Sequence, residues 1–130
     1  MSTVSSTVDP ERGTWLGAGV HLIGLFFSVL GVALAYLVSS TDFDRRNAKN
    51  ALNWHIPFFI AWNGSAVVAF IGVGLASAGW VGSVVSRLLI LLGLFGLLVL
   101  GLANLVVCFV ATSKAFNGES WEYPIVPELV

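Results

Sequence analysis

The chain has 130 residues, of which 57% are hydrophobic and only 10% are charged. Soluble domains carry about a quarter of charged residues, so this composition predicts an all-α integral membrane helical bundle. Six scattered cations and a net charge of −1 provide no basic surface for nucleic acid. The length leaves no room for a separate soluble module.

Residues 1–13 are rich in Ser and Thr and are predicted to form a disordered tail. The apolar run 15–39 follows. A signal peptide is the competing interpretation, because Ala33-Leu34-Ala35 resembles a cleavage site. The leading region is not basic, however, and the run exceeds the 7 to 15 residues or so of a signal core. We therefore expect a span, with one alternative left open: two half-helices bent near Gly31, which would change the side of the N-terminus.

The polar stretch 40–55 separates the first apolar run from the second. Thr41 is the expected N-cap, with Asp42 and Asp44 in the first helical turn. An apolar stripe with cationic flanks then predicts a short amphipathic helix over 42–53 at the membrane interface. The alternative is a solvated polar loop.

Two further apolar runs, 54–77 and 84–112, complete a membrane domain over residues 14–112. Each of the three runs reaches the roughly 20 residues that cross a hydrocarbon core of about 30 Å. The short connection between the last two predicts antiparallel neighbours. Each run also carries a stripe of small residues, which predicts close helix packing. Residues 113–130 form a polar C-terminal tail.

The orientation follows from the cations near the span ends. With three spans, one side collects four cations and the other side two. The first group is Arg45, Arg46, Lys49 and Lys114; the second is Arg12 and Arg87. This distribution predicts a multi-pass protein of the plasma membrane, with the N-terminus outside and the C-terminus in the cytoplasm.

Polar side chains at membrane depth are the candidates for chemistry, namely His21, Asn63 and Asn104. Interhelical hydrogen bonds are the preferred interpretation, because a buried polar group is costly unless it is paired. A transporter or channel with these residues around a midplane cavity is the alternative. Two separated histidines and the lone Cys108 do not predict a metal site. No catalytic motif is present, so we expect neither an enzyme nor a cofactor.

Two segments carry a family resemblance. The run FDRRNAKNALNW from Phe43 to Trp54 and the run KAFNGESWEYP from Lys114 to Pro124 resemble the signatures of a family of small prokaryotic membrane proteins of unknown function. That family is distantly similar to a membrane subunit of the Tic complex, the protein import machinery of the chloroplast inner envelope. His21 fits the family pattern too, whereas Asn47 replaces its usual His. The resemblance implies a non-enzymatic subunit or scaffold linked to protein translocation.

The resemblance also implies a set of signature residues, which we expect to form a polar cap over the bundle. They are Phe43, Arg45, Arg46, Ala48, Lys49, Ala51, Leu52, Asn53, Gly118, Glu119, Tyr123 and Pro124. In this hypothesis Glu119 or Glu122 lies near the cations of the first segment. The alternative is two independent solvated segments. The expected partners are membrane lipids and other membrane proteins or a second copy of the chain.

Overall fold

The computed structural model describes residues 14–79, 82–124, 126 and 128–130, and these residues contain helices and no strand. The helices are α1 (Trp15–Val38), α2 (Asp42–Ala78) and α3 (Ser83–Phe116). All three are long and apolar enough to cross a membrane, which confirms the predicted all-α membrane bundle. The tail predicted over residues 1–13 lies outside the described residues.

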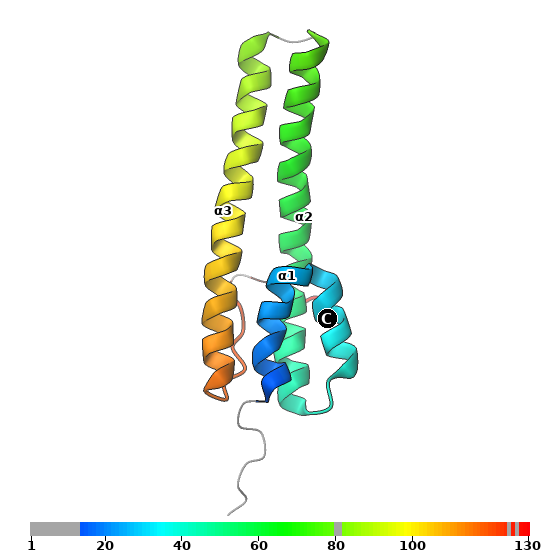
Figure 1. Ribbon diagram of the computed structural model, residues 1–130, viewed down its shortest axis with the longest axis vertical. Helices are drawn as coiled ribbons and strands as arrows, with labels where there is room; N and C mark the ends of the chain where they lie inside the picture. The colour runs from blue at the N-terminus through cyan, green and yellow to red at the C-terminus, as the bar shows by residue number, and fades with distance from the viewer. Residues whose placement is uncertain (1–13, 80–81, 125, 127) are drawn as a thin grey trace, which may run out of the picture.

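Helix α1 is folded back on itself. Ser28 has φ 52° and ψ −147°, which interrupts the helix and reverses the chain, so that two arms lie side by side (Figure 1). At 1.5 Å per residue the arms 15–27 and 29–38 measure about 20 and 15 Å, less than the roughly 30 Å of a hydrocarbon core. The helix expected over 15–39 is therefore interrupted, and the bend lies at Ser28, three residues before Gly31, where the bent alternative had placed it.

Helix α2 begins where the sequence predicted. The Thr41 side chain accepts a hydrogen bond from the Asp44 backbone N–H at 3.1 Å, as an N-cap does. The helix then continues through Pro57 to Ala78 without a break. A separate interfacial helix over 42–53 is therefore wrong. The apolar stripe that suggested it, which includes Ala48 and Ala51, is buried inside the protein instead of lying on lipid.

Helices α2 and α3 form the expected antiparallel hairpin, which turns after Gly79 in the left-handed conformation (φ 66°). Glycine allows the two backbones to approach closely. A Cβ on Gly93 would lie 2.5 Å from the Ala69 backbone nitrogen, and one on Gly72 would lie 2.8 Å from the Ser86 backbone oxygen. These contacts agree with the small-residue packing that holds membrane helices together.

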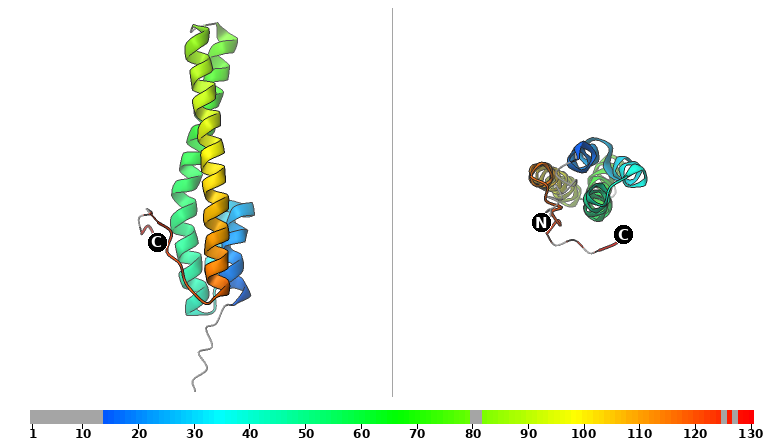
Figure 2. Two further views of the ribbon diagram at one scale, coloured as in Figure 1. Left: turned by 90° about the vertical axis from the view of Figure 1, so that its left-hand side faces the viewer. Right: turned by 90° about the horizontal axis from the view of Figure 1, so that it is seen from below.

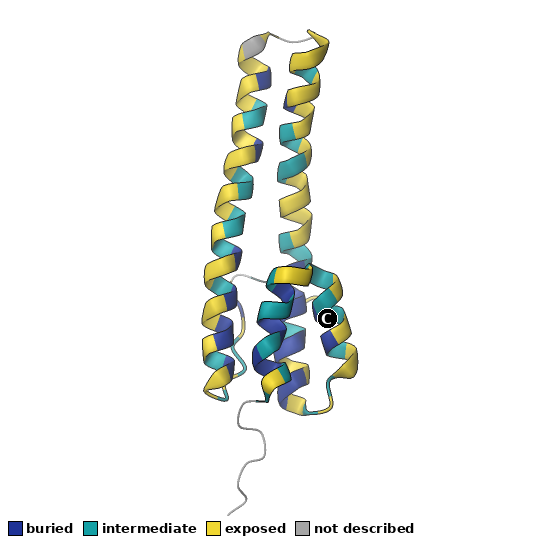
Figure 3. Ribbon diagram, viewed as in Figure 1, coloured by how far each residue is buried: buried dark blue, intermediate teal, exposed yellow. Residues whose placement is uncertain are grey.

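The core lies at one end of the molecule. Buried residues gather where the α1 arms pack against the first part of α2 and the last part of α3, which we call the base (Figure 3). Beyond the tip of α1, the described residues of α2 and α3 run on as a pair, which we call the upper hairpin. Its apolar side chains are largely exposed.

The start of α1, the start of α2 and the end of α3 all lie at the same end of the base, which we call the polar end (Figures 1 and 2). The predicted orientation, with the N-terminus outside and the C-terminus in the cytoplasm, assumed that α1 crosses the membrane once. The break at Ser28 removes that assumption.

Candidate functional site

A buried hydrogen-bond chain runs through the base and begins at His21, which is fully buried. Its Nε2 lies 3.1 Å from Asn47 Oδ1, and its Nδ1 lies 2.6 Å from the Tyr123 hydroxyl. Because the Asn47 oxygen only accepts, Nε2 carries the hydrogen and Nδ1 accepts from the tyrosine. The Asn47 amide in turn donates to the Phe43 carbonyl at 3.0 Å. Each polar side chain in this series of hydrogen bonds thus has a partner.

Tyr123 reaches this network from the C-terminal segment. Its ring stacks on that of Trp54, with centroids 5.5 Å apart and an interplanar angle of 10°. Burial raises the pKa of the Tyr123 phenol, because the charged form loses its hydration. A raised pKa means that the neutral phenol is favoured in the folded protein. The neutral Tyr123 side chain therefore contributes its full stabilisation of the folded protein below about pH 10, and this stabilisation is lost as the pH rises above that.

The C-terminal segment lies along α2, and we call its described residues from 118 to 130 the strap (Figure 2). Its backbone N–H groups at Leu129 and Val130 donate to Asn53 Oδ1 at 2.8 and 3.0 Å. An ion pair joins Lys49 Nζ to Glu128 Oε1 at 2.7 Å, and the lysine lowers the pKa of the Glu128 carboxyl. That pair is present at neutral pH and is lost as the pH falls through the lowered pKa.

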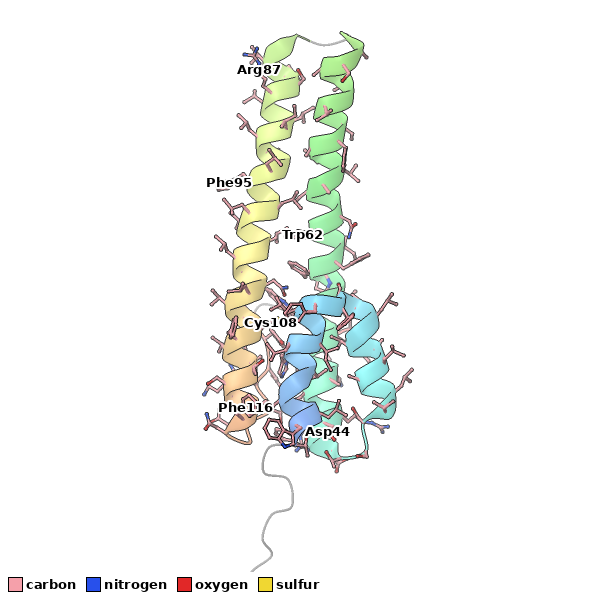
Figure 4. The ribbon with its side chains drawn as sticks, viewed as in Figure 1. Asp44, Trp62, Arg87, Phe95, Cys108 and Phe116 are labelled. Atoms are coloured by element: carbon pink, nitrogen blue, oxygen red, sulfur yellow. The ribbon has the colours of Figure 1, made fainter. Side chains whose placement is uncertain are left out.

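A second polar group lies beside the tip of α1. His55 is fully buried, and its Nδ1–H donates to the Ala51 carbonyl at 2.8 Å. Its Nε2 faces Cys108 Sγ at 3.9 Å, in the base (Figure 4). Gly24 makes room for this ring, because a Cβ there would lie 2.5 Å from Nε2. The group extends to Asn104, whose Oδ1 accepts from Trp54 Nε1 at 2.8 Å.

The two signature segments are in contact. Asn50 Nδ2 donates to the Trp121 carbonyl at 3.1 Å, and Arg46 Nε lies 3.3 Å from Ser120 Oγ. Glu119 pairs with Lys114 at 2.8 Å rather than with a cation of α2. Glu122 lines a hollow of about 130 Å³ together with Lys49.

The other signature residues are divided between core and surface. Phe43, Ala48, Ala51 and Leu52 are buried, whereas Arg45 is exposed with its guanidinium 5.7 Å from the centre of the Tyr36 ring. Gly118 forms a turn with φ 80°, and Pro124 is exposed. That these residues act together as a functional cap stays a prediction.

The polar residues expected at membrane depth take different positions. His21 and Asn104 are buried in the base, as interhelical hydrogen bonding requires. Asn63 lies on an exposed face of α2 and donates to the Phe59 carbonyl of its own helix at 2.7 Å. The sequence interpretation missed the burial of Tyr123. A tyrosine inside a polar signature was the only signal that pointed to the strap.

Within the described part of the chain, no three His, Cys, Asp or Glu side chains are grouped in a way that could hold a metal ion.

Comparison with known proteins gives one family. The model of the magnetosome magnetite crystal formation protein family matches residues 12–130, which include all three helices and the strap. Comparisons with curated proteins and with solved structures give no match. The resemblance to a chloroplast import subunit, and the translocation role drawn from it, are therefore wrong. The transporter alternative has no support from this match either.

Proposed function

Because the chain belongs to the magnetosome magnetite crystal formation protein family, we propose that it is a non-enzymatic protein of the magnetosome membrane that supports magnetite crystal formation. The family match over residues 12–130 is the observation that carries this proposal. The fold adds a second support, since the upper hairpin has the apolar exposed surface that lipid requires.

The proposed topology places the polar end in the cytoplasm. Among the described cations, Arg45, Arg46 and Lys49 at the start of α2 and Lys114 at the end of α3 belong to the polar end, whereas Arg87 lies at the opposite end (Figure 4). Cytoplasmic segments of membrane proteins carry the excess of Lys and Arg. The turn between α2 and α3 then faces the other side of the membrane.

The proposed mode of action is that of a scaffold. The charged side chains of the strap and of the first turns of α2 lie next to a base in which His21, Asn47 and Tyr123 are paired with one another. A rigid base with a polar surface suits the attachment of other proteins from the cytoplasm. The strap completes this surface, because Tyr123 fastens it to both α1 and α2.

The proposal is tested by deleting the gene in a magnetosome-forming host and measuring crystal size and number by electron microscopy. We expect the deletion to change the crystals and the intact gene to restore them. Tyr123→Ala removes the side chain that fastens the strap and is expected to restore them poorly. Pro124→Ala, at an exposed position of the same strap, is the matched control and is expected to restore them fully.

Immunoblots of the membrane fraction show whether each variant accumulates. Crystals that are unchanged by the deletion would contradict the proposed function. Full restoration by Tyr123→Ala, with the strap displaced, would contradict the scaffold role of the strap while leaving the family function intact.

A further inference from the structure

The molecule is wide at one end and narrow at the other. Around the base, the two arms of α1 and the strap lie beside α2 and α3, whereas the described residues of the upper hairpin come from α2 and α3 alone (Figures 1 and 2). The cross-section therefore decreases along the axis that crosses the membrane.

The lengths place this change of width inside the bilayer. The apolar run 84–112 of α3 measures about 43 Å at 1.5 Å per residue, close to the roughly 40 to 45 Å of a bilayer with its interfacial regions. The α1 arms, about 20 and 15 Å long, start at the polar end and reach only part of that depth. Helix α1 thus widens the protein in the leaflet at the polar end and not in the other leaflet.

The outer face of α1 has the chemistry of a lipid-facing surface. Phe26, Phe27, Leu30 and Leu34 are 78%, 68%, 78% and 64% exposed. At the lower end of the second arm, Arg45 lies over the ring of Tyr36 and is exposed. Apolar side chains above and a cation below match the acyl chains and the anionic headgroups of one leaflet. The occupant of this face is therefore the lipid of the leaflet at the polar end.

We propose that the chain is a one-leaflet wedge that prefers membranes in which the leaflet at the polar end is convex. A convex leaflet is stretched at the depth of its headgroups, so that a hairpin inserted there fills space that lipids leave open. Helices inserted in one leaflet are sensitive to curvature for this reason. This inference goes beyond the proposed role in crystal formation and does not depend on it.

The test uses the full chain, labelled with a dye and reconstituted into giant vesicles of phosphatidylcholine with phosphatidylglycerol, from which narrow tubes are pulled. A membrane-impermeant quencher separates the molecules whose polar end faces outward from those whose polar end faces inward. The outward population should be enriched in the tube, with a ratio of tube to vesicle density above one. The inward population should be depleted, with a ratio below one.

The sign reversal is the decisive result, because a preference for tubes that arises from thickness or lipid composition would not depend on orientation. Equal ratios in the two orientations would overturn the proposal. The gene deletion tests the role in crystal formation, and the tube experiment tests the curvature preference. Either proposal can therefore fail without the other.

A pair of variants tests whether α1 is the wedge. Leu30→Gln with Leu34→Gln makes the outer face of α1 polar, whereas Leu30→Met with Leu34→Met keeps it apolar. Both positions are exposed, so neither pair disturbs the core. We expect the ratio of the outward population to fall toward one for the glutamine pair and to stay unchanged for the methionine pair. Equal ratios for the two pairs would show that α1 is not the wedge. If the glutamine pair does not fold, the orientation test on the unmodified chain still decides.

Discussion

At the scale of single residues, Tyr123 fixes the state of the buried histidine. Replacing it by phenylalanine removes the hydroxyl that donates to His21 Nδ1 and leaves a buried acceptor without a partner. We expect Tyr123→Phe to lower the free energy of unfolding by about 1 to 3 kcal/mol, the usual cost of such a group. Unfolding of the detergent-solubilised protein, followed by circular dichroism, measures it. Tyr36→Phe is the control, because it keeps the ring over which Arg45 lies. Equal losses in the two variants would contradict the assignment.

Ser28 has a strained backbone, because it is the one described residue other than glycine with a positive φ. Its hydroxyl oxygen is also buried without a hydrogen-bond partner within the described structure. Glycine adopts this conformation without a clash. We expect Ser28→Gly to stabilise the protein by about 1 kcal/mol. A strained residue costs of order 1 to 3 kcal/mol, and part of the gain from relieving that strain is offset because glycine increases the conformational entropy of the unfolded chain.

The same unfolding experiment checks this expectation, with Ser28→Ala as the comparison. Alanine removes the unpaired hydroxyl but keeps a side chain at positive φ, so its gain should be smaller. A less stable Ser28→Gly protein would show that the serine side chain, rather than the backbone, holds the turn.

At the scale of elements, the hairpin of α2 and α3 depends on backbone contact. A Cβ on Gly93 would collide with the backbone of α2, whereas one on Gly74 would meet nothing within 4 Å. We expect Gly93→Ala to destabilise the protein by about 1 to 3 kcal/mol through overpacking. Gly74→Ala should be neutral or slightly stabilising, because alanine favours helix more than glycine does. Thermal unfolding in detergent compares the two, and equal behaviour would mean that the helices do not touch at Gly93.

The elements also show what the sequence could and could not predict. The Thr41 cap and the close approach at Gly72 and Gly93 follow from local patterns of residue type, and these expectations agree with the structure. The break at Ser28 does not follow from such a pattern, because serine is no strong helix breaker. It depends on packing between distant segments, such as Gly24 against His55. The amphipathic pattern of 42–53 was read correctly as a helix, but its apolar face packs on protein rather than on lipid.

The candidate site was predictable only in part. The two polar segments were singled out, and they contact each other through Asn50 and Trp121. The contact between His21 and Tyr123, which joins α1 to the strap, was not predicted from the sequence. Hydrophobic periodicity carries no information on contacts between residues 102 positions apart.

At the scale of the whole molecule, the hairpin in α1 decides the topology. In a Cys108→Ser background, Trp15→Cys and Asn117→Cys place exposed thiols at the start of α1 and the end of α3, and Ser77→Cys places one near the opposite turn. A membrane-impermeant maleimide should label Trp15→Cys and Asn117→Cys from the cytoplasmic side and Ser77→Cys from the other side. Labelling of Trp15→Cys and Asn117→Cys from opposite sides would mean that α1 crosses the membrane.

The hydrogen bond between His21 and Tyr123 also bears on the order in which the contacts of α1 can form during synthesis. The ribosome makes α1 first, yet its arms are too short to be held across the bilayer and their partners in α3 and the strap do not yet exist. The contacts of α1 with α2, such as that between His21 and Asn47, can form before these partners are made, and the hydrogen bond to Tyr123 is added last. A chain truncated before Tyr123 would therefore keep the contact between His21 and Asn47 but leave His21 Nδ1 without its donor.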